Sequence, residues 1–381
     1  MEIKTLGELC NIVSGGTPSR SKAEFWNEGT IPWIKIGNIK GKYVNEADEF
    51  ITQKGLAGSS AKMLAKGTVL YTIFATLGEV GILDIDACTN QAIAGLTIKD
   101  TNQLSIDYLY YYLRSKKAYV NNIGRGVAQN NINMSILKSF EVPLPELSRQ
   151  TEIVEIISKV SKIIETRQQE LECLDNLIKA RFVEMFGEGL VDDGRFPLLP
   201  ISDIGRVVSG ATPKTGNADY WEGNNIWITP AELSEKSFVI YDSIRKITDE
   251  GVRSCAANLL PIGTVILSSR APIGKVAIVG TPMYCNQGFK NIIPNKKINS
   301  TYLYELLSMQ TGYLNSLGRG ATFKEISKQI VENIKVKVPP MELQNKFADF
   351  VNQVDKSKVA VKKALEQAQL LFDSLMQEYF G

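Results

Sequence analysis

The chain has 381 residues, more than one ordinary hydrophobic core holds, so we expect two or more domains. Its composition, 44% apolar and 22% charged, is ordinary for a globular protein, and the lack of an apolar run of about 18 residues argues against a membrane span. The formal net charge is only +2, and the absence of histidine excludes a Ser-His-Asp triad and removes the commonest metal ligand.

The remaining chemistry-bearing residues give no sign of an active site. The five cysteines are scattered and form no CxxC pair, so we expect neither a disulfide framework nor a zinc site. No carboxylates pair at a recognisable spacing, and we expect no catalytic residues, no metal and no cofactor. The first ten residues lack a basic segment followed by an apolar one, so no secretory signal is expected, and we predict a cytoplasmic protein.

The sequence repeats itself at an offset of about 195 residues. Val13–Pro18 returns as Val208–Pro213, and Gly67–Leu70 returns as Gly263–Ile266. The shorter matches are Phe25-Trp26 with Tyr220-Trp221, Pro32-Trp33-Ile34 with Ile226-Trp227-Ile228, Asn90-Gln91 with Asn286-Gln287, and Gly124-Arg125-Gly126 with Gly318-Arg319-Gly320. The longest match is Gln150–Gly187 with Gln344–Gly381, and all of the matches follow the same order in both copies. The order of these matches indicates a tandem duplication.

The first part of each repeat, residues 1–145 and 188–338, is expected to be a globular domain of mixed α/β (α+β) character. Val69–Phe74 is typical of a buried strand, and Tyr108–Tyr119 of a helix. Elsewhere, short apolar runs alternate with Gly, Asn, Thr and Pro turn signals. The recurring tryptophans are expected to pack in the core.

The second part of each repeat, residues 146–187 and 339–381, predicts a long helix of roughly 35 residues, about 50 Å. Apolar residues recur in steps of four and three, as in a coiled-coil seam. In the first copy these are Ile153, Ile157, Val160, Ile164, Leu171, Leu174 and Ile178, with Arg167 interrupting. In the second copy they are Phe347, Val351, Val354, Val361, Leu365, Ala368, Phe372 and Leu375, with Lys358 interrupting.

A helix with one apolar seam needs a partner to bury it, and the second helix supplies the same seam. We expect the two helices to pair as an antiparallel coiled coil within the chain, giving a pseudo-two-fold internal repeat. The alternative is that the helices serve different interfaces, for example in a homodimer. A rod that holds two similar modules apart would act as a ruler, as in DNA readers that hold two half-sites apart.

Two loops per repeat carry residues suited to nucleic acid. Arg and Lys read guanine edges, Asn and Gln pair with adenine, and hydroxyls bond phosphates. The loop 15–22 and its copy 210–217 contribute the candidates Thr17, Ser19, Arg20, Lys22, Thr212, Lys214, Thr215 and Asn217. The glycine-flanked arginines and the runs that follow them contribute Arg125, Gln129, Asn130, Asn131, Arg319 and Lys324. The alternative is an ordinary surface turn for the first pair of loops and a solvated loop before the next element for the second pair.

Arg270 follows a predicted strand, where Phe74 stands in the first copy, and could read a groove or form a salt bridge. Charge supports DNA binding only mildly, because the globular parts carry a small excess of basic residues and the sequence pI is about 8.1. A weakly charged reader would rely on base contacts or on a partner that binds phosphates.

The order of these motifs resembles the specificity (S) subunit of type I restriction-modification systems. The resemblance rests on Ser-Gly-Gly-Thr-Pro at 14–18 and its copy at 209–213, and on Arg125 and Arg319 between glycines. It also rests on Val142–Pro145 leading to Gln150 and Val338-Pro339-Pro340 leading to Gln344. It covers essentially the whole chain.

The resemblance implies that each globular part is a target recognition domain that reads one half of a bipartite, asymmetric site in double-stranded DNA. It implies that the coiled coil sets the spacer, that two methylation subunits dock on the chain, and that restriction subunits join that complex. The chain itself would be non-catalytic. Consistent with this, the Asn-Pro-Pro-aromatic motif of adenine methyltransferases is absent. The alternative is a structural coiled-coil scaffold that presents two protein-binding modules.

Overall fold

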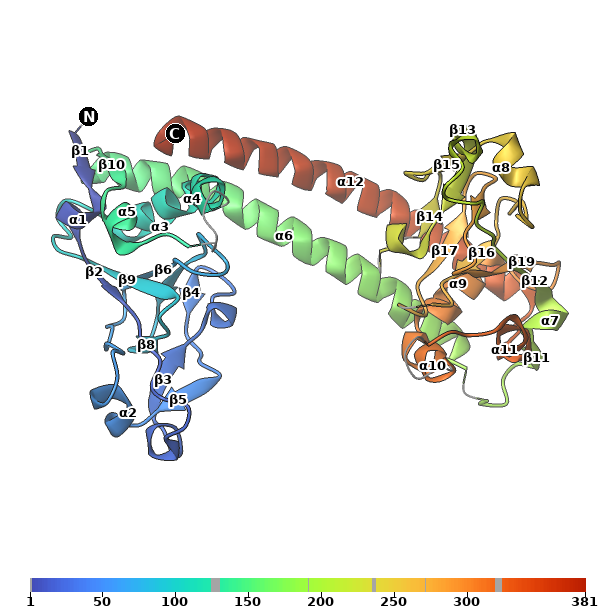
Figure 1. Cartoon of the computed structure of the whole chain (residues 1–381), viewed down its shortest axis with the longest axis horizontal. Helices are drawn as coiled ribbons and strands as arrows, with labels where there is room; N and C mark the ends of the chain where they lie inside the picture. Colours follow the sequence, from blue (N-terminus) through green and yellow to red (C-terminus); the bar gives the residue numbers. More distant parts are fainter. Residues whose placement is uncertain (1, 125–130, 191, 235–237, 271, 319–323) are drawn as a thin grey trace. The chain divides into compact units, whose positions relative to one another are not determined.

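The computed structural model describes residues 2–124, 131–190, 192–234, 238–270, 272–318 and 324–381 (Figure 1). The chain divides into two compact units. Unit 1 comprises Met1–Gln168 and Lys363–Gly381, and unit 2 comprises Gln169–Lys362. Within the described residues, no helix combines the length and the apolar character needed to cross a membrane.

Unit 1 has a mixed α/β fold built on short strands. A five-stranded sheet has the order β2-β9-β6-β7-β4, a three-stranded sheet the order β5-β3-β8, and β1 pairs with β10. The strands are β1 (Glu2–Thr5), β2 (Cys10–Ser14), β3 (Ile31–Ile34), β4 (Tyr43–Val44), β5 (Glu49–Ile51), β6 (Val69–Thr72), β7 (Val80–Leu83), β8 (Cys88–Thr89), β9 (Ile93–Ile98) and β10 (Glu141–Leu144). The helices are α1 (Leu6–Leu9), η1 (Ala23–Phe25), η2 (Ile36–Asn38), α2 (Gln53–Ala57), α3 (Ile106–Ser115), α4 (Lys117–Gly124) and α5 (Met134–Lys138).

Unit 2 repeats this topology. Its sheets have the orders β12-β19-β16-β17-β14, β15-β13-β18 and β11-β20. The strands are β11 (Leu198–Pro200), β12 (Gly205–Ser209), β13 (Trp221–Ile228), β14 (Val239–Ile240), β15 (Lys246–Ile247), β16 (Val265–Leu267), β17 (Val276–Val279), β18 (Tyr284–Cys285), β19 (Lys290–Pro294) and β20 (Lys335–Lys337). The helices are α7 (Ile201–Ile204), η3 (Ala218–Tyr220), η4 (Pro230–Glu232), α8 (Asp249–Arg253), α9 (Ser300–Ser308), α10 (Thr311–Ser316) and α11 (Lys328–Asn333). The expected duplication of a mixed α/β domain is therefore confirmed.

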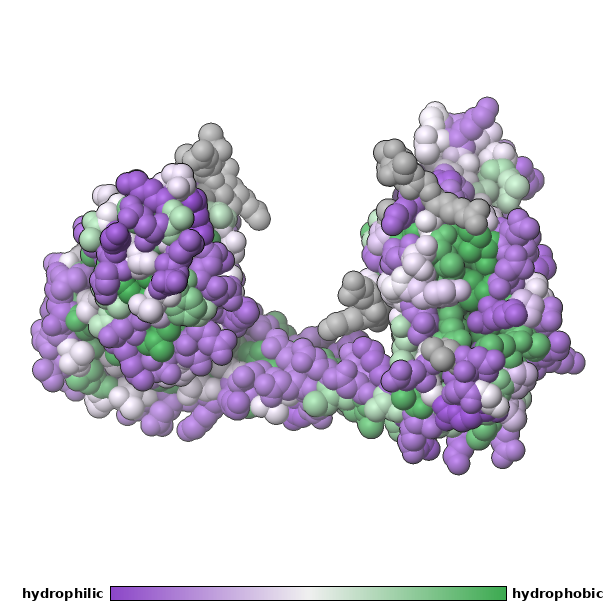
Figure 2. All heavy atoms as spheres, turned by 90° about the horizontal axis from the view of Figure 1, so that it is seen from below, coloured by the Kyte–Doolittle hydropathy of each residue, from purple (hydrophilic) through white to green (hydrophobic). Residues whose placement is uncertain are grey.

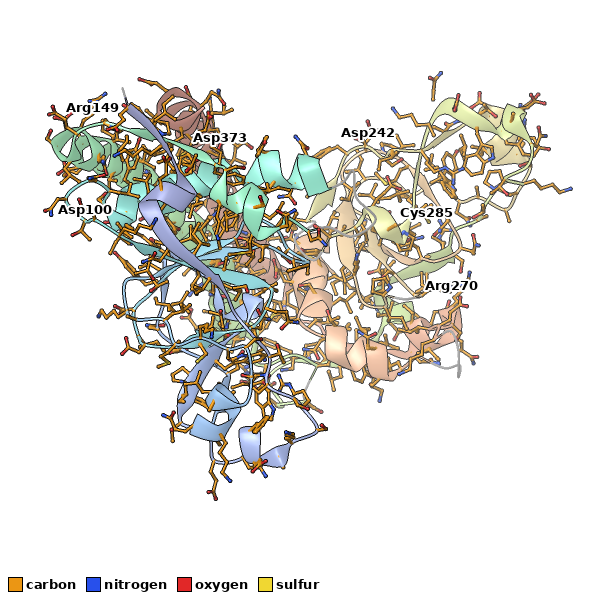
Figure 3. All side chains as sticks on the ribbon, turned by 60° about the vertical axis from the view of Figure 1, so that its left-hand side comes forward. Asp100, Arg149, Asp242, Arg270, Cys285 and Asp373 are labelled. Atoms are coloured by element: carbon orange, nitrogen blue, oxygen red, sulfur yellow. The ribbon has the colours of Figure 1, made fainter. Side chains whose placement is uncertain are left out.

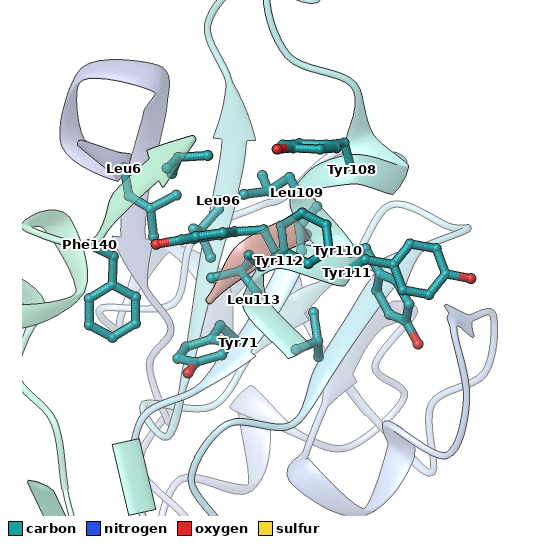
Figure 4. Packing of buried hydrophobic residues seen from close by; sticks show 14 of the residues in the cluster. Leu6, Tyr71, Leu96, Tyr108, Leu109, Tyr110, Tyr111, Tyr112, Leu113 and Phe140 are labelled. Carbon is teal, nitrogen blue, oxygen red and sulfur yellow. The ribbon is translucent and has the colours of Figure 1, made fainter. Parts of the chain in front are cut away.

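The core of unit 1 forms around α3, whose residues from Tyr108 to Leu113 are all buried (Figure 4). Ser105 begins the helix, because its hydroxyl accepts a hydrogen bond from Tyr108 N at 3.2 Å. The prediction of one helix over Tyr108–Tyr119 was wrong in its length. The N–H of Lys116 bonds to Leu113 O at 3.2 Å, a tighter turn than the α-helix makes, and a second helix begins at Lys117.

The predicted strand Val69–Phe74 is also shorter than expected, since β6 ends at Thr72. Thr72 accepts hydrogen bonds at both its backbone oxygen, from Gly78 N, and its hydroxyl, from Glu79 N. These bonds close the turn between β6 and β7. Phe74 lies just beyond the strand and is 39% exposed rather than buried.

The two long helices are α6 (Leu147–Phe186) and α12 (Met341–Phe380), each of 40 residues and therefore longer than the predicted 35. In unit 1, the first half of α6 buries Ile153, Ile157 and Val160 in one cluster with Phe372, Met376 and Phe380. In unit 2, the second half of α6 buries Ile178, Phe182 and Phe186 with Phe347, Val351 and Val354. Within each unit the start of one helix thus packs on the end of the other, which is the expected antiparallel pairing.

The predicted seam is largely buried. Ile164 and Leu375 pack on the core of unit 1, Leu174 packs on that of unit 2, and Val361 is 7% exposed. Leu171 and Leu365 are half-buried. The interrupting Lys358 is accommodated because its ammonium lies 2.8 Å from Asp175 and 3.2 Å from Asp355.

A buried glutamine ties each long helix to its globular domain. Gln150 donates to Gln103 O at 2.7 Å and to Pro145 O at 2.9 Å, and it accepts from Ser105 N at 3.0 Å. Gln344 makes the same three kinds of bond in unit 2, to Lys297 O, Pro339 O and Asn299 N. Because an unpaired buried amide is costly, these bonds explain why glutamine follows the proline segment in both copies.

Candidate nucleic-acid interface

The loop after β2 in unit 1, and its counterpart after β12 in unit 2, is fixed by a close backbone approach. In unit 1, Gly15 N donates to Ile93 O at 3.0 Å and Gly16 N to Thr89 O at 2.9 Å. A Cβ at Gly15 would lie 2.2 Å from Asn90 O, and one at Gly210 would lie 2.0 Å from Asn286 O. The repeated glycines are therefore required for packing against the repeated Asn-Gln turn.

The threonines of these loops have internal partners. Thr17 donates its hydroxyl hydrogen bond to the side-chain oxygen of Gln91, and Thr212 does the same to Gln287. The bond joins two of the repeated sequence motifs and explains why they recur together. Thr17 is nevertheless exposed and Thr212 half-buried, so both line the surface of their loops.

A guanidinium stacks on a tryptophan pair in each unit. In unit 1, Arg20 lies 3.7 Å from the ring centroid of Trp26 and pairs with Glu49 at 2.5 Å. These contacts and the Lys35 ammonium hold the pKa of the Glu49 carboxyl below its usual value, with the Arg20 hydrogen bond the largest cause. Trp26 meets Trp33 edge to face at 5.1 Å. Arg20 is thus held in place by the protein itself.

In unit 2 the same position is filled from a different element. Arg245 lies 3.8 Å from the ring centroid of Trp221, which meets Trp227 edge to face at 5.1 Å. Thr215 stands at the sequence position of Arg20 and has no guanidinium to offer. Arg245 was not predicted from the sequence, and the recurring tryptophan pair without a matching arginine was the available signal.

The prediction that the tryptophans pack in the core is confirmed for Trp33 and Trp227, which are each 2% exposed and whose indole N–H groups donate to Gly16 O and Ala211 O. Trp26 and Trp221 are only half-buried. The other loop candidates lie at the surface with local contacts. Ser19 bonds Ser21 at 2.9 Å, Lys22 lies 4.8 Å from the Phe25 ring, Asn217 caps η3, and Lys214 and Thr215 are exposed.

The glycine-flanked loops are only partly described. Arg125, Gln129, Asn130 and Arg319 lie outside the described residues. Asn131 is half-buried and Lys324 is exposed. Asn131 forms an isolated β-bridge with Phe74, and Glu325, next to Lys324, forms the equivalent bridge with Arg270.

Arg270 lies at the outer surface of unit 2 (Figure 3). Its Nε is 3.1 Å from Glu325 Oε2, and the buried ammonium of Lys290 is 3.3 Å from Glu325 Oε1. Of the two roles considered for Arg270, the salt bridge is therefore present. Lys290 was missed by sequence analysis, because nothing in a strand pattern marks a buried lysine. Within the described residues, no group of three or more Cys, Asp or Glu side chains could hold a metal ion.

Comparison with known proteins decides the family. The model of the type I restriction modification DNA specificity domain matches this chain twice, over residues 1–174 and 198–370. The chain belongs to this family. The resemblance inferred from the motifs is therefore confirmed, and the two matches correspond to the two copies of the repeat.

Several named relatives belong to the same family. The MjaIX specificity subunit of Methanocaldococcus jannaschii is 36% identical over 211 residues, which cover 54% of this chain and 48% of that protein. The EcoR124I/EcoR124II specificity subunit of Escherichia coli is 28% identical over 195 residues, 47% of this chain and 48% of that protein. The MjaVIII specificity subunit of M. jannaschii is 20% identical over 97% of this chain and 89% of its own length. The first two matches therefore span about half of each relative.

Solved structures share the fold. The S subunit of a type I restriction-modification system from M. genitalium matches with a TM-score of 0.57 at 18% identity, covering 100% of this chain and 96% of that one. A chain from a study of complex assembly and conformational transition of the type I R-M system matches with a TM-score of 0.63 at 16% identity, covering 100% and 97%.

Proposed function

We propose that this chain is the DNA-recognition subunit of a type I restriction-modification complex, with no catalytic step of its own. Residues 1–145 and 188–338 each act as a target recognition domain for one half of a bipartite site in double-stranded DNA. The observation that carries the proposal is the double match to a DNA specificity domain over two units of the same topology.

The site is asymmetric, because the two domains present different side chains on equivalent backbone. Thr17 and Thr212 keep the same internal bond, whereas Phe74 and Arg270 differ at matching bridges. Two domains that conserve their frame and vary their surface read two different sequences. Contacts to DNA come from the surface residues of the loops, among them Ser19, Lys22, Lys214, Thr215 and Lys324, together with Arg125, Gln129, Asn130 and Arg319.

The long helices at 146–187 and 339–381 set the unread spacer between the half-sites. Their burial of matched apolar residues within each unit supports this role, because a packed pair of helices resists bending. Removing a heptad from both helices shortens the pair by about 10 Å, at 1.5 Å per residue. The spacer then changes by about three base pairs, at 3.4 Å each.

Two methylation subunits dock on exposed apolar residues of these helices, and restriction subunits join through them. Figure 2 shows hydrophobic residues among the hydrophilic ones along the helices. Leu177 of α6 and Leu371 of α12 stand at matching positions of the repeat and are 47% and 51% exposed. Ile163 and Leu370 are exposed as well. An exposed leucine at the same position of each helix supports two copies of one partner.

The experiment is to express the full chain with its neighbouring methylation subunit and to map modified adenines in the host DNA. We expect one asymmetric motif of two short blocks around a fixed gap. A variant lacking residues 165–171 and 362–368 should keep both blocks and shorten the gap. Altered blocks would contradict the proposal that the helices set only the spacer length. No modification, together with no DNA affinity of the complex at low salt, would favour the scaffold instead.

A further inference from the structure

The two units build the same backbone frame at one surface position. In unit 1, Ile73 N donates to Ala92 O at 2.8 Å, and Ile132 N donates to Ile73 O at 3.1 Å. In unit 2, Ser269 N donates to Gly288 O at 2.8 Å, and Ile326 N donates to Ser269 O at 3.0 Å. The residues next in sequence to these hydrogen-bonded ones form the bridges Phe74–Asn131 in unit 1 and Arg270–Glu325 in unit 2. These four residues therefore occupy matching places.

The side chains on this frame change together. Unit 1 carries an exposed phenyl ring and an amide, whereas unit 2 carries a guanidinium and a carboxylate 3.1 Å apart. Beneath them, Ser14 pairs with Ala94 in unit 1 and Ser209 with Lys290 in unit 2, so Ala94 and Lys290 also match. Lys290, with a side chain 9% exposed, supports Glu325 from below. Fully buried Ala94 leaves no such charge beneath Asn131.

Glu325 offsets the buried charge of Lys290, which is a stabilising role, but stability does not explain the exposed Arg270. An exposed ion pair contributes about 0–1 kcal/mol, and the Arg270 and Glu325 side chains are 48% and 37% exposed. The same bridge also forms in unit 1 without any ion pair. A frame that is kept while its exposed side chains vary is what a reading surface requires.

The chemistry of each pair matches a different base pair. In the major groove, arginine bonds the O6 and N7 acceptors of guanine, and glutamate accepts from the N4 amino group of cytosine. Asparagine pairs with N6 and N7 of adenine, and phenylalanine contacts the methyl group of thymine. In unit 2 the cations Arg270 and Lys290 also offset the repulsion between Glu325 and nearby phosphates.

We propose that Arg270 and Glu325 read a G·C base pair in the half-site of unit 2, and that Phe74 and Asn131 read an A·T base pair in that of unit 1. Lys290 is a positioning residue that holds Glu325. This inference rests on the proposed function and deepens it, because it assigns one base pair of each half-site to named residues.

The test uses the full complex of this chain with its methylation subunit and compares the wild type with Arg270→Phe/Glu325→Asn. We expect adenine mapping to show a G·C to A·T change at one position of one block, with every other position and the other block unchanged. Arg206→Gln, which removes an exposed positive charge elsewhere in unit 2, should leave the motif unaltered. A double variant that keeps the wild-type motif at every position would overturn the inference while leaving the proposed function intact.

A second measurement covers a variant that loses activity. The wild-type complex is bound to the mapped site, and each guanine of the unit 2 block is replaced in turn by 7-deazaguanine, which lacks the N7 acceptor. The single variant Arg270→Ala identifies the unit 2 block. Base substitutions in that block should weaken binding of this variant less than they weaken binding of the wild type. A full bidentate contact corresponds to about 5- to 150-fold in affinity, so one replacement should weaken wild-type binding by no more than this range. The same replacement should weaken binding of Arg270→Ala less. Equal losses in both proteins at every guanine, or a block without a G·C pair, would refute the assignment.

Discussion

Phe182 of α6 should be among the side chains on which unit 2 most depends. It is 0% exposed, stacks on Tyr302 with ring centroids 5.4 Å apart, and meets Phe347 edge to face at 5.3 Å. Phe186 lies 5.0 Å away on the same helix. Substitution by alanine removes the ring from all of these contacts and leaves a cavity where α6, α9 and α12 meet.

The cost follows from this packing. Replacing a buried phenylalanine by alanine costs about 3–5 kcal/mol, and each aromatic pair adds about 0.5–1.5 kcal/mol beyond area burial. With several rings in contact, Phe182→Ala should lie near the upper end, at about 4–5 kcal/mol. For a domain of about 150–250 residues, this corresponds to a decrease in the melting temperature of unit 2 of about 8–20 °C.

Urea denaturation and calorimetry of the isolated chain measure the effect. Leu177→Ala, on the same helix but 47% exposed, is the matched control and should change stability by no more than about 0.5 kcal/mol. Phe182→Leu should cost less than the alanine variant, because it retains much of the buried volume. A loss for Phe182→Ala no larger than that of the control would refute the packing argument.

Two further predictions concern charge and docking. Burial raises the pKa of Glu305 to about 7 from 4.5, so the folded state retains a proton that the unfolded state releases, and stability falls as pH rises between these values. The free energy of unfolding of Glu305→Gln, measured by urea titration, should therefore rise relative to that of the wild type between pH 5 and pH 8, by up to about 3 kcal/mol. A difference that does not change with pH would contradict this. Leu177→Ser/Leu371→Ser should weaken methylation-subunit binding at least tenfold in calorimetric titration, and unchanged affinity would place docking elsewhere.

The sequence alone was sufficient to predict the duplication and the pair of long helices, but not the order of the strands. A repeated order of motifs and a seam in steps of four and three depend on local spacing, which one chain displays directly. The seam was followed only to Ile178 and Leu375, so the aromatic ends of the helices were missed. Phe182, Phe186 and Phe380 fall outside the strict seam and are buried because the globular domains pack over them.

Only the tertiary structure decided which polar residues act together. Arg20 and Arg245 differ in sequence position, yet both stack on a tryptophan pair, because strand pairing brings separate segments to one place. Likewise, Lys290 and Glu325 are far apart in the chain and meet beside Arg270. Spacing along the chain determines which helices and repeats form, whereas contacts between distant segments depend on sheet register, which one sequence does not display.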